Sequence, residues 1–592
     1  MDQTPIRERL RWHLATYFYY NGVTLHPSEE SGGTTGVWHI FGRLALALGQ
    51  ETKPTMCRTP FVDRMDYPHP VNGHPSSTHL GTNLSHESKQ PISDSAWDVA
   101  LSGNVSTAEL RGHSVRGAFV TMFVQAGTFL VGLITLAVLA RLLTPSDFGL
   151  IAMVAVMTGF VGQFVDLGMS MATVQRHELN GGQVSTLFWI NVLMGSAVMA
   201  VTAACAPLIA WFYAEPRLTA VTLILSTGFF FGGLTVQHQA LLKRKMRFSA
   251  LAGIRMSSAT AGSAVAIACA WRGAGYWALV AGQLSTTLTQ LALVWMGCRW
   301  RPGAPVRDSG VRPLIAFGGN LTASNVLNYI ARQIDRLLIG RSFGAQPLGI
   351  YSKAAQLLVM PLRQITAPVS GVAIPVLSRL QYEPERFRDF YRHGIQILVT
   401  VEMPVVVFSF VAADKLVLLL LGRQWSGAVP VFRILAPAAW MMTFNAATLW
   451  VYTSLGQVHR RLRWAGVAAT VRTVTMIAAL PFGIHGIAAA YSLLVCSLKF
   501  PGIAYCYRFS HLRMRDLLGV LWRPALASVG AGGLLFGVTS CVAVTASLFP
   551  QIAFEGALYG ILYLSIWLAL PRGRPILWGM FRLARDLRRG GG

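Results

Sequence analysis

The sequence predicts an all-α polytopic membrane protein, with about 14 transmembrane helices that form two pseudo-symmetric six-helix bundles around a central cavity. An apolar composition, a series of long apolar segments and an internal repeat lead to this fold class. Of the 592 residues, 53% are hydrophobic and only 13% are charged, and the mean hydropathy is +0.47. A soluble chain usually has about 25% charged residues, so this one has too little charge to cover a water-exposed surface.

Apolar segments of membrane-spanning length follow one another from Gly117 onward. A helix crosses a bilayer with about 20 apolar residues, and only helices or closed barrels satisfy the backbone in lipid. Segments this long and uniformly apolar are typical of helices. The expected spans are 117–139, 149–170, 185–209, 219–241, 250–270, 276–296, 314–339, 346–374, 394–419, 427–449, 464–481, 484–507, 523–546 and 552–571.

Basic residues alternate from loop to loop. The formal net charge of +25 comes from Lys and Arg between the apolar segments, which is typical of membrane topology and not of nucleic-acid binding. One set of loops is rich in these cations, apart from its first member with Arg176 alone, and the alternate set has at most one arginine per loop. The rich loops are 243–247, 299–312, 379–392, 460–463 and 508–523; the others hold Arg141, Arg217, Arg272, Arg341 and Arg423. The positive-inside rule therefore places both termini in the cytoplasm.

The chain also resembles itself. Residues 140–151 (ARLLTPSDFGLI) are echoed by 340–351 (GRSFGAQPLGIY), and 273–278 (GAGYWA) by 483–488 (GIHGIA). Two basic loops, ending in Arg247-Phe248 and Arg463-Trp464, give a third landmark in the same order. These landmarks indicate two homologous halves. Because each half has an even number of helices, the halves are expected to be parallel repeats about an axis normal to the membrane.

We expect five regions along the chain. They are a disordered cytoplasmic extension at 1–112, a first six-helix lobe at 113–300, a second at 301–510, two additional helices at 511–571 and a basic cytoplasmic tail at 572–592. The extension is polar and has no segment long enough to span a bilayer. An alternative for this extension is that the native start lies downstream of it. The tail is either an amphipathic helix on anionic lipid or a solvated segment.

Polar and charged residues inside the predicted spans gather at the start of the second half. A charge in hydrocarbon is costly and usually faces a cavity or a partner. Spacings of three and four residues bring those of span 314–339 to one helix face, and span 346–374 adds two cations. The candidate cavity residues are Asn325, Asn328, Arg332, Asp335, Arg336, Lys353 and Arg363.

This stripe predicts a net cationic cavity that suits an anionic substrate, because arginine's planar fork fits phosphate oxygens. The alternative is a structural ion-pair network, in which Asp335 pairs with Arg332 at the i+3 spacing. The first half has fewer charged residues at the same place, where it offers Gln125, Thr128, Thr135, Gln163 and Asp166. Asp166 and Asp335 are the candidates for coupling to an ion.

Several catalytic signatures are absent from the sequence. It contains no P-loop, no HExxH, no GxSxG and no loop long enough for a catalytic domain, so we expect no enzyme. The seven cysteines form no CxxC and read as small hydrophobic residues. We therefore expect no metal and no cofactor, and an ion gradient, the membrane potential or the substrate gradient as the energy source.

Short motifs resemble those of Wzx-type polysaccharide exporters, of the colanic-acid-exporter-like branch of the multidrug/oligosaccharidyl-lipid/polysaccharide (MOP) flippase superfamily. They are 139–150 (LARLLTPSDFGL), 164–169 (FVDLGM), 333–340 (QIDRLLIG) and 348–351 (LGIY). The resemblance covers about residues 115–510 and extends toward 571. It implies a V-shaped pair of six-helix bundles in the bacterial inner membrane.

The resemblance also implies a function, which is transfer of undecaprenyl-diphosphate-linked oligosaccharide repeat units to the periplasmic leaflet for surface polysaccharide synthesis. Carried over residue by residue, it implies that Arg332, Asp335, Arg336 and Lys353 bind or gate this lipid-linked anion. The implied partners are membrane lipids and the polysaccharide polymerase and assembly proteins. A lipid II flippase, a multidrug antiporter and a membrane enzyme are the alternatives, and the cationic lining argues against an organic-cation antiporter.

Overall fold

The computed structural model describes residues 107–166, 170, 173–174, 180–306, 329, 332–541, 547–571 and 573–574. The helices in chain order are α4 (Thr107–Leu142), α5 (Pro145–Val161), α7 (Gly181–Ala204), α8 (Ala206–Tyr213), α9 (Arg217–Arg244), α10 (Phe248–Trp271), α11 (Trp277–Cys298), α13 (Ala345–Arg379), α14 (Pro384–Val411), α15 (Ala413–Leu420), α16 (Ala428–Met442), α17 (Asn445–Ser454), α18 (Val458–Ala478), α19 (Gly483–Tyr507), α20 (Met514–Cys541) and α21 (Leu548–Ala569). Three 3₁₀ turns, η1 (Gly162–Phe164), η2 (Arg423–Trp425) and η3 (Leu480–Phe482), and a helical segment at 332–343 complete the described secondary structure.

The predicted fold class is confirmed: the described part of the chain is a polytopic helical membrane protein. Eleven of its helices are long and apolar enough to cross a bilayer. α10 and α18 are not among the eleven, and most of the expected span 314–339 lies outside the described residues. The number fourteen therefore stays a prediction. The five regions also stay a prediction, because residues 1–106 and 575–592 lie outside the described residues. α4 begins at Thr107, inside the predicted extension.

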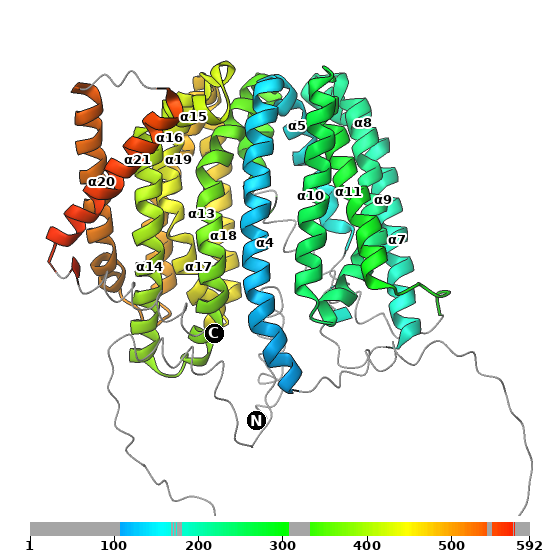
Figure 1. Ribbon diagram of the computed structural model, residues 1–592, viewed down its shortest axis with the longest axis horizontal. Helices are drawn as coiled ribbons and strands as arrows, with labels where there is room; N and C mark the ends of the chain where they lie inside the picture. The colour runs from blue at the N-terminus through cyan, green and yellow to red at the C-terminus, as the bar shows by residue number, and fades with distance from the viewer. Residues whose placement is uncertain are drawn as a thin grey trace, which may run out of the picture.

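The first group of helices, which we call the first lobe, runs from α4 to α11. α10 packs along both α4 and α11, and α9 packs along α7 and α11. Figure 1 shows this group on one side of the molecule, with α4 next to the second group. α5 packs on both groups, since its main neighbour is α13 of the second group and it also contacts α9 of its own.

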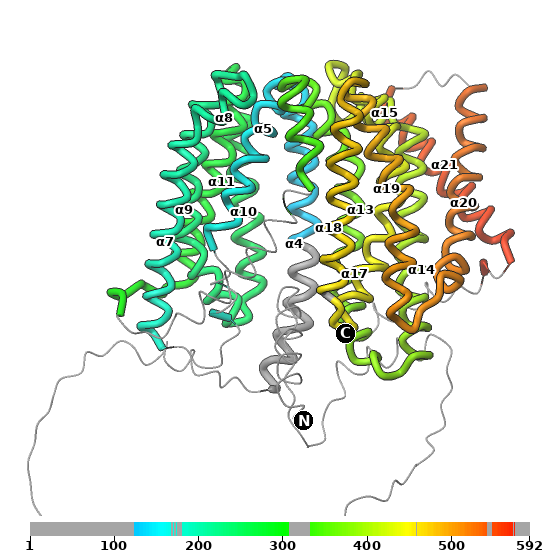
Figure 2. The backbone as a smooth tube through the Cα atoms, turned by 180° about the vertical axis from the view of Figure 1, so that it is seen from behind, coloured from blue at the N-terminus to red at the C-terminus, as the bar shows by residue number. Residues whose placement is uncertain are grey.

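The second group, from the segment 332–343 to α19, is the second lobe. α13 packs on α14, α16 and α17, while α19 packs on α16 and α18. α20 and α21 lie at the outer edge of this lobe, where α20 packs along α14 (Figures 1 and 2). A Lys415–Glu555 ion pair ties α21 to α15.

The two lobes repeat the same succession of elements. In each lobe a long helix is followed by a helix of eight residues, α7 by α8 and α14 by α15. α5 and α13, which begin 200 residues apart, occupy equivalent places in the two lobes and pack on each other. The internal repeat read from the sequence therefore corresponds to two pseudo-symmetric bundles.

α5 and α13 cross at a pair of glycines, 200 residues apart. A Cβ on Gly149 would overlap the Ala345 carbonyl oxygen, and a Cβ on Gly349 would overlap the Pro145 carbonyl oxygen. The first turn of each helix thus packs on the glycine of the other. Because only glycine lacks a Cβ, these two positions permit a backbone-to-backbone contact that no other residue allows.

Both helices start in ways that suit this crossing. α5 begins with a capping box in which the Asp147 N–H donates to Thr144 Oγ1 at 3.3 Å and the Thr144 N–H donates to Asp147 Oδ2 at 2.9 Å. α13 begins after Gly344, whose φ of 82° falls in the left-handed region that favours glycine. The first turn of each helix therefore has local contacts or backbone geometry of its own that suit the crossing.

Alanine at either glycine should weaken the contact between the lobes. We expect Gly149→Ala and Gly349→Ala each to lower the free energy of unfolding by about 1–3 kcal/mol, the usual cost of overpacking. The midpoint of thermal unfolding in detergent measures the effect. Gly228→Ala, in α9, is the matched control because its Cβ meets no atom within 4 Å. Equal midpoints for Gly149→Ala and Gly228→Ala would contradict the close crossing.

Candidate functional site

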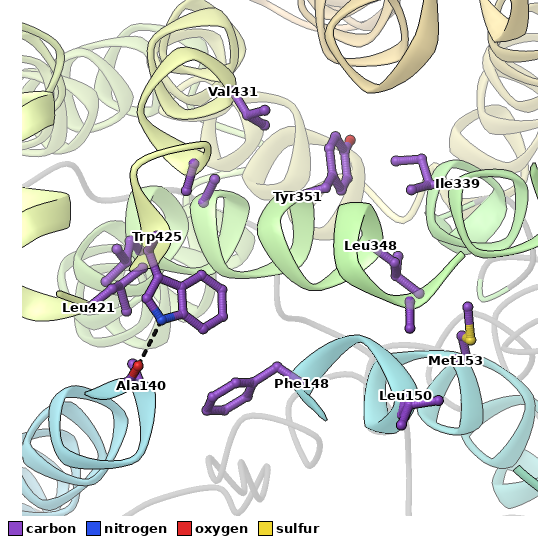
Figure 3. Packing of buried hydrophobic residues seen from close by; sticks show 14 of the residues in the cluster. Ala140, Phe148, Leu150, Met153, Ile339, Leu348, Tyr351, Leu421, Trp425 and Val431 are labelled. Atoms are coloured by element: carbon purple, nitrogen blue, oxygen red, sulfur yellow. Dashed lines mark hydrogen bonds between the residues drawn. The ribbon is translucent and has the colours of Figure 1, made fainter. Parts of the chain in front are cut away.

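The lobes are joined by hydrogen bonds to helix ends next to the α5–α13 crossing. The Trp425 indole N–H donates to the Ala140 carbonyl oxygen at 2.8 Å, as the dashed line in Figure 3 marks, and the Gln424 amide donates to the same oxygen. In the other direction, Arg141 donates to the Leu419 carbonyl oxygen at 2.7 Å. Carbonyls in the last turn of a helix lack intrahelical partners, so each lobe satisfies a helix end of the other.

We call this contact the seam; it comprises residues 140–149, 345–349 and 419–425. Its core is apolar, with the Phe148 and Trp425 rings edge to face at 5.4 Å between centroids. Figure 3 shows Phe148 on α5 beside Trp425, and Leu348 of α13 facing Met153 of α5. The seam is thus an apolar contact between the lobes, with hydrogen bonds at one margin.

A reciprocal contact joins the segment 332–343 to the first lobe. Gly340 packs so closely on Tyr213 that a Cβ would lie 2.8 Å from the ring, and the Arg341 guanidinium lies 5.9 Å from the centroid of Phe212. Phe212 and Tyr213 end α8, the counterpart of α15. In both lobes, therefore, the end of the first helix meets the short helix of the opposite lobe, as pseudo-two-fold symmetry requires.

Three cations of the second lobe donate to neutral amide oxygens and not to carboxylates. The bonds are Arg336 to Gln333 Oε1 at 3.1 Å, Lys353 to Gln356 Oε1 at 3.0 Å and Lys499 to Asn445 Oδ1. None of the five ion pairs found among the described residues includes any of the three. An amide carries no net charge, so the three cations leave this part of the lobe with a net positive charge.

Lys353 connects these cations to the seam. Its ammonium lies 4.4 Å from the centroid of the Phe148 ring, in a cation–π contact across the lobes. Arg336 is near enough to interact electrostatically with Lys353. A ligand that bound these two cations would therefore lie next to the seam.

Asp335 does not pair with Arg332, so that expectation is wrong. Asp335 is buried and accepts a hydrogen bond from the Tyr351 hydroxyl at 2.8 Å, while Arg332 is exposed. The helix turns the Asp335 carboxyl toward α13 and away from Arg332. An ion-pair network between these two residues therefore does not hold the site together.

The other predicted cavity residues lie apart from this cluster. Arg363 is exposed, and its neighbour Gln364 accepts a hydrogen bond from Gln125 of α4 at 3.2 Å. Asn325 and Asn328 lie outside the described residues. The structure thus brings together Asp335, Arg336 and Lys353, and places Arg332 and Arg363 at exposed positions.

The first lobe is less charged at the equivalent place. Asp166 accepts hydrogen bonds from Ser170, at 2.9 Å from its N–H and 2.5 Å from its hydroxyl. Thr128 and Thr135 donate to carbonyls of their own helix. Among the described residues no group of three His, Cys, Asp or Glu could hold a metal ion. Asp166 also interacts electrostatically with Lys243, which is near Arg255, so a carboxylate offsets part of the positive charge of the first lobe here.

Known proteins similar to this chain are exporters and flippase relatives. Residues 138–430 match the family described as polysaccharide biosynthesis protein. The match covers just under half of the chain, which therefore resembles this family over that stretch. Among curated proteins, the teichuronic acid biosynthesis protein TuaB of Bacillus subtilis (strain 168) is 24% identical over 69% of this chain and 86% of its own length. The lipopolysaccharide biosynthesis protein WzxC of Escherichia coli (strain K12) is 25% identical over 55% of this chain and 67% of its own length.

Solved structures agree on the fold of this chain. The lipid II flippase MurJ, in an inward closed conformation, matches with a TM-score of 0.62 and 12% identity, over 76% of this chain and 98% of its own. An inward-facing multidrug-resistance MATE transporter of the MOP superfamily gives a TM-score of 0.52 and 14% identity, over 66% and 95%. The predicted resemblance to the polysaccharide exporters of this superfamily is confirmed.

Two cations of the second lobe were not placed in the site by sequence reasoning. Arg472 of α18 lies 5.4 Å from the centroid of the Tyr491 ring and interacts electrostatically with Lys499 of α19. In the sequence they stand alone in their segments, and Lys499 is expected to extend toward the membrane surface. The eight-residue spacing of Tyr491 and Lys499, which puts both on one stripe of α19, was the available signal.

Removing the Tyr351 hydroxyl should destabilise the protein. Asp335 Oδ1 already has no partner, so Tyr351→Phe would leave both buried carboxyl oxygens without a hydrogen bond. We expect a loss of about 1–3 kcal/mol, the cost of an unsatisfied buried polar group. Thermal unfolding measures it, with Tyr382→Phe as control because Tyr382 is 85% exposed. Equal unfolding temperatures for the two variants would contradict the stabilising role of the Tyr351–Asp335 hydrogen bond.

Proposed function

We propose that this protein is a flippase that carries undecaprenyl-diphosphate-linked oligosaccharide units across the bacterial inner membrane for surface polysaccharide synthesis. The observation that carries the proposal is a set of three cations, Arg336, Lys353 and Lys499, each bonded to a neutral amide inside the second lobe. The names of TuaB and WzxC as polysaccharide biosynthesis proteins support the substrate class. The coarser point, a transporter of the MOP superfamily and not an enzyme, rests on the family and the fold.

An anionic ligand explains why these cations have no carboxylate partner. A lysine or arginine within a membrane costs a few kcal/mol unless a partner or water compensates it. The diphosphate of a lipid-linked sugar supplies such a partner for part of the cycle and leaves afterwards. A permanent carboxylate partner would compete with it, and phosphate binds arginine through two parallel hydrogen bonds.

The seam supports alternating access as the mechanism. It closes the space between the lobes at the ends of the helices where α5 and α13 begin. If both termini are cytoplasmic, as the loop charges predict, this closed end faces the periplasm. In that orientation the substrate would enter from the cytoplasmic leaflet, and the seam would have to open before release. Lys353, in contact with Phe148 at the seam, connects ligand binding to that opening.

Two further functions in the same superfamily remain as alternatives. A lipid II flippase would use the same cations, because its substrate also carries a diphosphate, and MurJ has the same fold. A multidrug antiporter is less compatible with the cation cluster, because like charges repel organic cations. Polysaccharide polymerase and assembly proteins are the partners that we propose for the first function.

Loss of the cation cluster should abolish flipping without loss of insertion. We expect Arg336→Gln with Lys353→Gln to reduce transport of a fluorescent undecaprenyl-diphosphate-linked sugar in proteoliposomes at least roughly tenfold. Each lost hydrogen bond to a charged group is worth about 1.5–3 kcal/mol. Arg386→Gln is the matched control, since Arg386 is exposed and pairs with Glu383 outside this cluster. Wild-type transport by the double variant would reject the assignment, and preference for a lipid II analogue would select that alternative.

A further inference from the structure

A second charged side chain is buried in the second lobe, away from the cation cluster. Glu402 of α14 is fully buried within a helix that is apolar and long enough to cross the membrane. Its Oε1 lies 2.5 Å from Thr366 Oγ1 of α13, and its Oε2 has no hydrogen-bond partner. Glu402 thus has one hydrogen-bond partner, a neutral hydroxyl.

No cation compensates this carboxyl among the described residues. None of the five ion pairs found among the described residues includes Glu402, and the side-chain contact found there for its carboxyl is the one with Thr366. The charged or titratable groups of the helices packed on α14 have other partners or are exposed. On α13, Tyr351 donates to Asp335, Lys353 donates to Gln356, and Arg363 and Arg379 are exposed. Arg433 of α16 pairs with Asp414 of α15, and Lys415 of α15 pairs with Glu555 of α21. On α20, Asp516 pairs with Arg388 of α14, Arg515 is exposed and Arg523 donates to Pro571. Tyr559 and Tyr563 of α21 donate to Ser528 and Thr400.

The burial of Glu402 without a cation beside it in the described part of the chain favours its neutral form, and the contacts of Thr366 are compatible with a proton on the carboxyl. The Thr366 hydroxyl has one hydrogen and lies within bonding distance of two oxygens, Glu402 Oε1 and the Leu362 carbonyl oxygen at 2.9 Å. A carbonyl can only accept. If the hydroxyl donates to Leu362, the Glu402 carboxyl must be the donor in its contact with Thr366, and it must then carry a proton. An ionised carboxylate with one hydrogen bond and no cation would be far more costly at this depth.

Glu402 also lies at a point where α14 can bend. Pro404 has no N–H, so the Thr400 carbonyl oxygen loses its intrahelical partner. The Tyr563 hydroxyl of α21 donates to that oxygen at 2.9 Å and replaces the missing bond. On the facing helix, Pro361 and Pro368 flank Thr366. Prolines are the commonest cause of helix kinks, so the Glu402–Thr366 contact joins two helices at their weakest points.

We propose that Glu402 is a proton-binding site, which carries a proton while α13 and α14 are in contact and releases it when α13 moves away. In the release step the carboxylic acid gives its proton to water that enters between the two helices and becomes a carboxylate; closure reverses this step. Because α13 also forms the seam, one proton is exchanged each time the seam opens and closes. The coupling to transport rests on the proposed function, whereas the bound proton does not.

Infrared spectroscopy tests the bound proton directly. In the difference spectrum of wild type minus Glu402→Gln at neutral pH, we expect the C=O stretch of a protonated carboxylic acid, shifted in D₂O. Glutamine can donate to Thr366 as the protonated acid does, so this variant should fold. Thr366→Val should shift the band, because it removes the only partner. A carboxylate band at Glu402 would overturn the proposal, and so would an acid band that Thr366→Val leaves unmoved.

A transport assay tests the coupling separately. A pH gradient across proteoliposomes should change the flipping rate of wild type and have no effect on Glu402→Gln, which should still move substrate down its own gradient. A response to the pH gradient in Glu402→Gln would overturn the coupling. Arg336→Gln should slow flipping with and without the gradient. If wild type showed the acid band but moved no diphosphate-linked lipid, the proposed function would fail while the proton site stood.

Discussion

The close crossing of α5 and α13 at Gly149 and Gly349 is the constraint on which the rest of the structure depends. Each glycine receives the first turn of the opposite helix, so the helix starts and the glycines must keep a fixed spacing in both halves. That requirement explains why residues 140–151 and 340–351 still resemble each other when most of the two halves do not. The neighbouring hydrogen bonds of Gln424 and Trp425 can form only if the crossing holds α4 against η2.

Within this symmetric frame the two lobes have different chemistry. The second lobe holds Arg336, Lys353 and Lys499 on neutral amides, and the first lobe offers Asp166 bonded to Ser170. A symmetric distribution would place like charges on both sides of the space between the lobes, and their repulsion would oppose closure of the seam. A larger net charge on one side lets the lobes approach each other and still attract an anion. Lys353 shows the result, since its ammonium lies against the Phe148 ring of the first lobe.

The fold could be predicted from the sequence because its signals are periodic and long. The apolar segments, the alternation of loop charge and the repeat each extend over many residues, so errors at single positions do not matter. The site could be predicted only in part. Arg336 and Lys353 stand in a polar stripe, but helix periodicity could not decide whether Asp335 faces Arg332 or Tyr351, which are both close to it in the fold. Arg472 and Lys499 are near each other through tertiary packing of α18 on α19, and the spacing of Tyr491 and Lys499 marks only the α19 side of that contact.

α13 connects every feature discussed above. Its first turn forms the seam with α5, Lys353 belongs to the cation cluster, and Thr366 contacts Glu402 beyond Pro361. An α-helix is stiff along its axis but kinks most readily at proline, and Lys353 lies between the seam and the first proline in the interior of α13, Pro361. On α14, Tyr563 of α21 replaces the hydrogen bond that Pro404 removes. α21 therefore does more than extend the second lobe, because it satisfies α14 at the position where its own backbone bonding is interrupted.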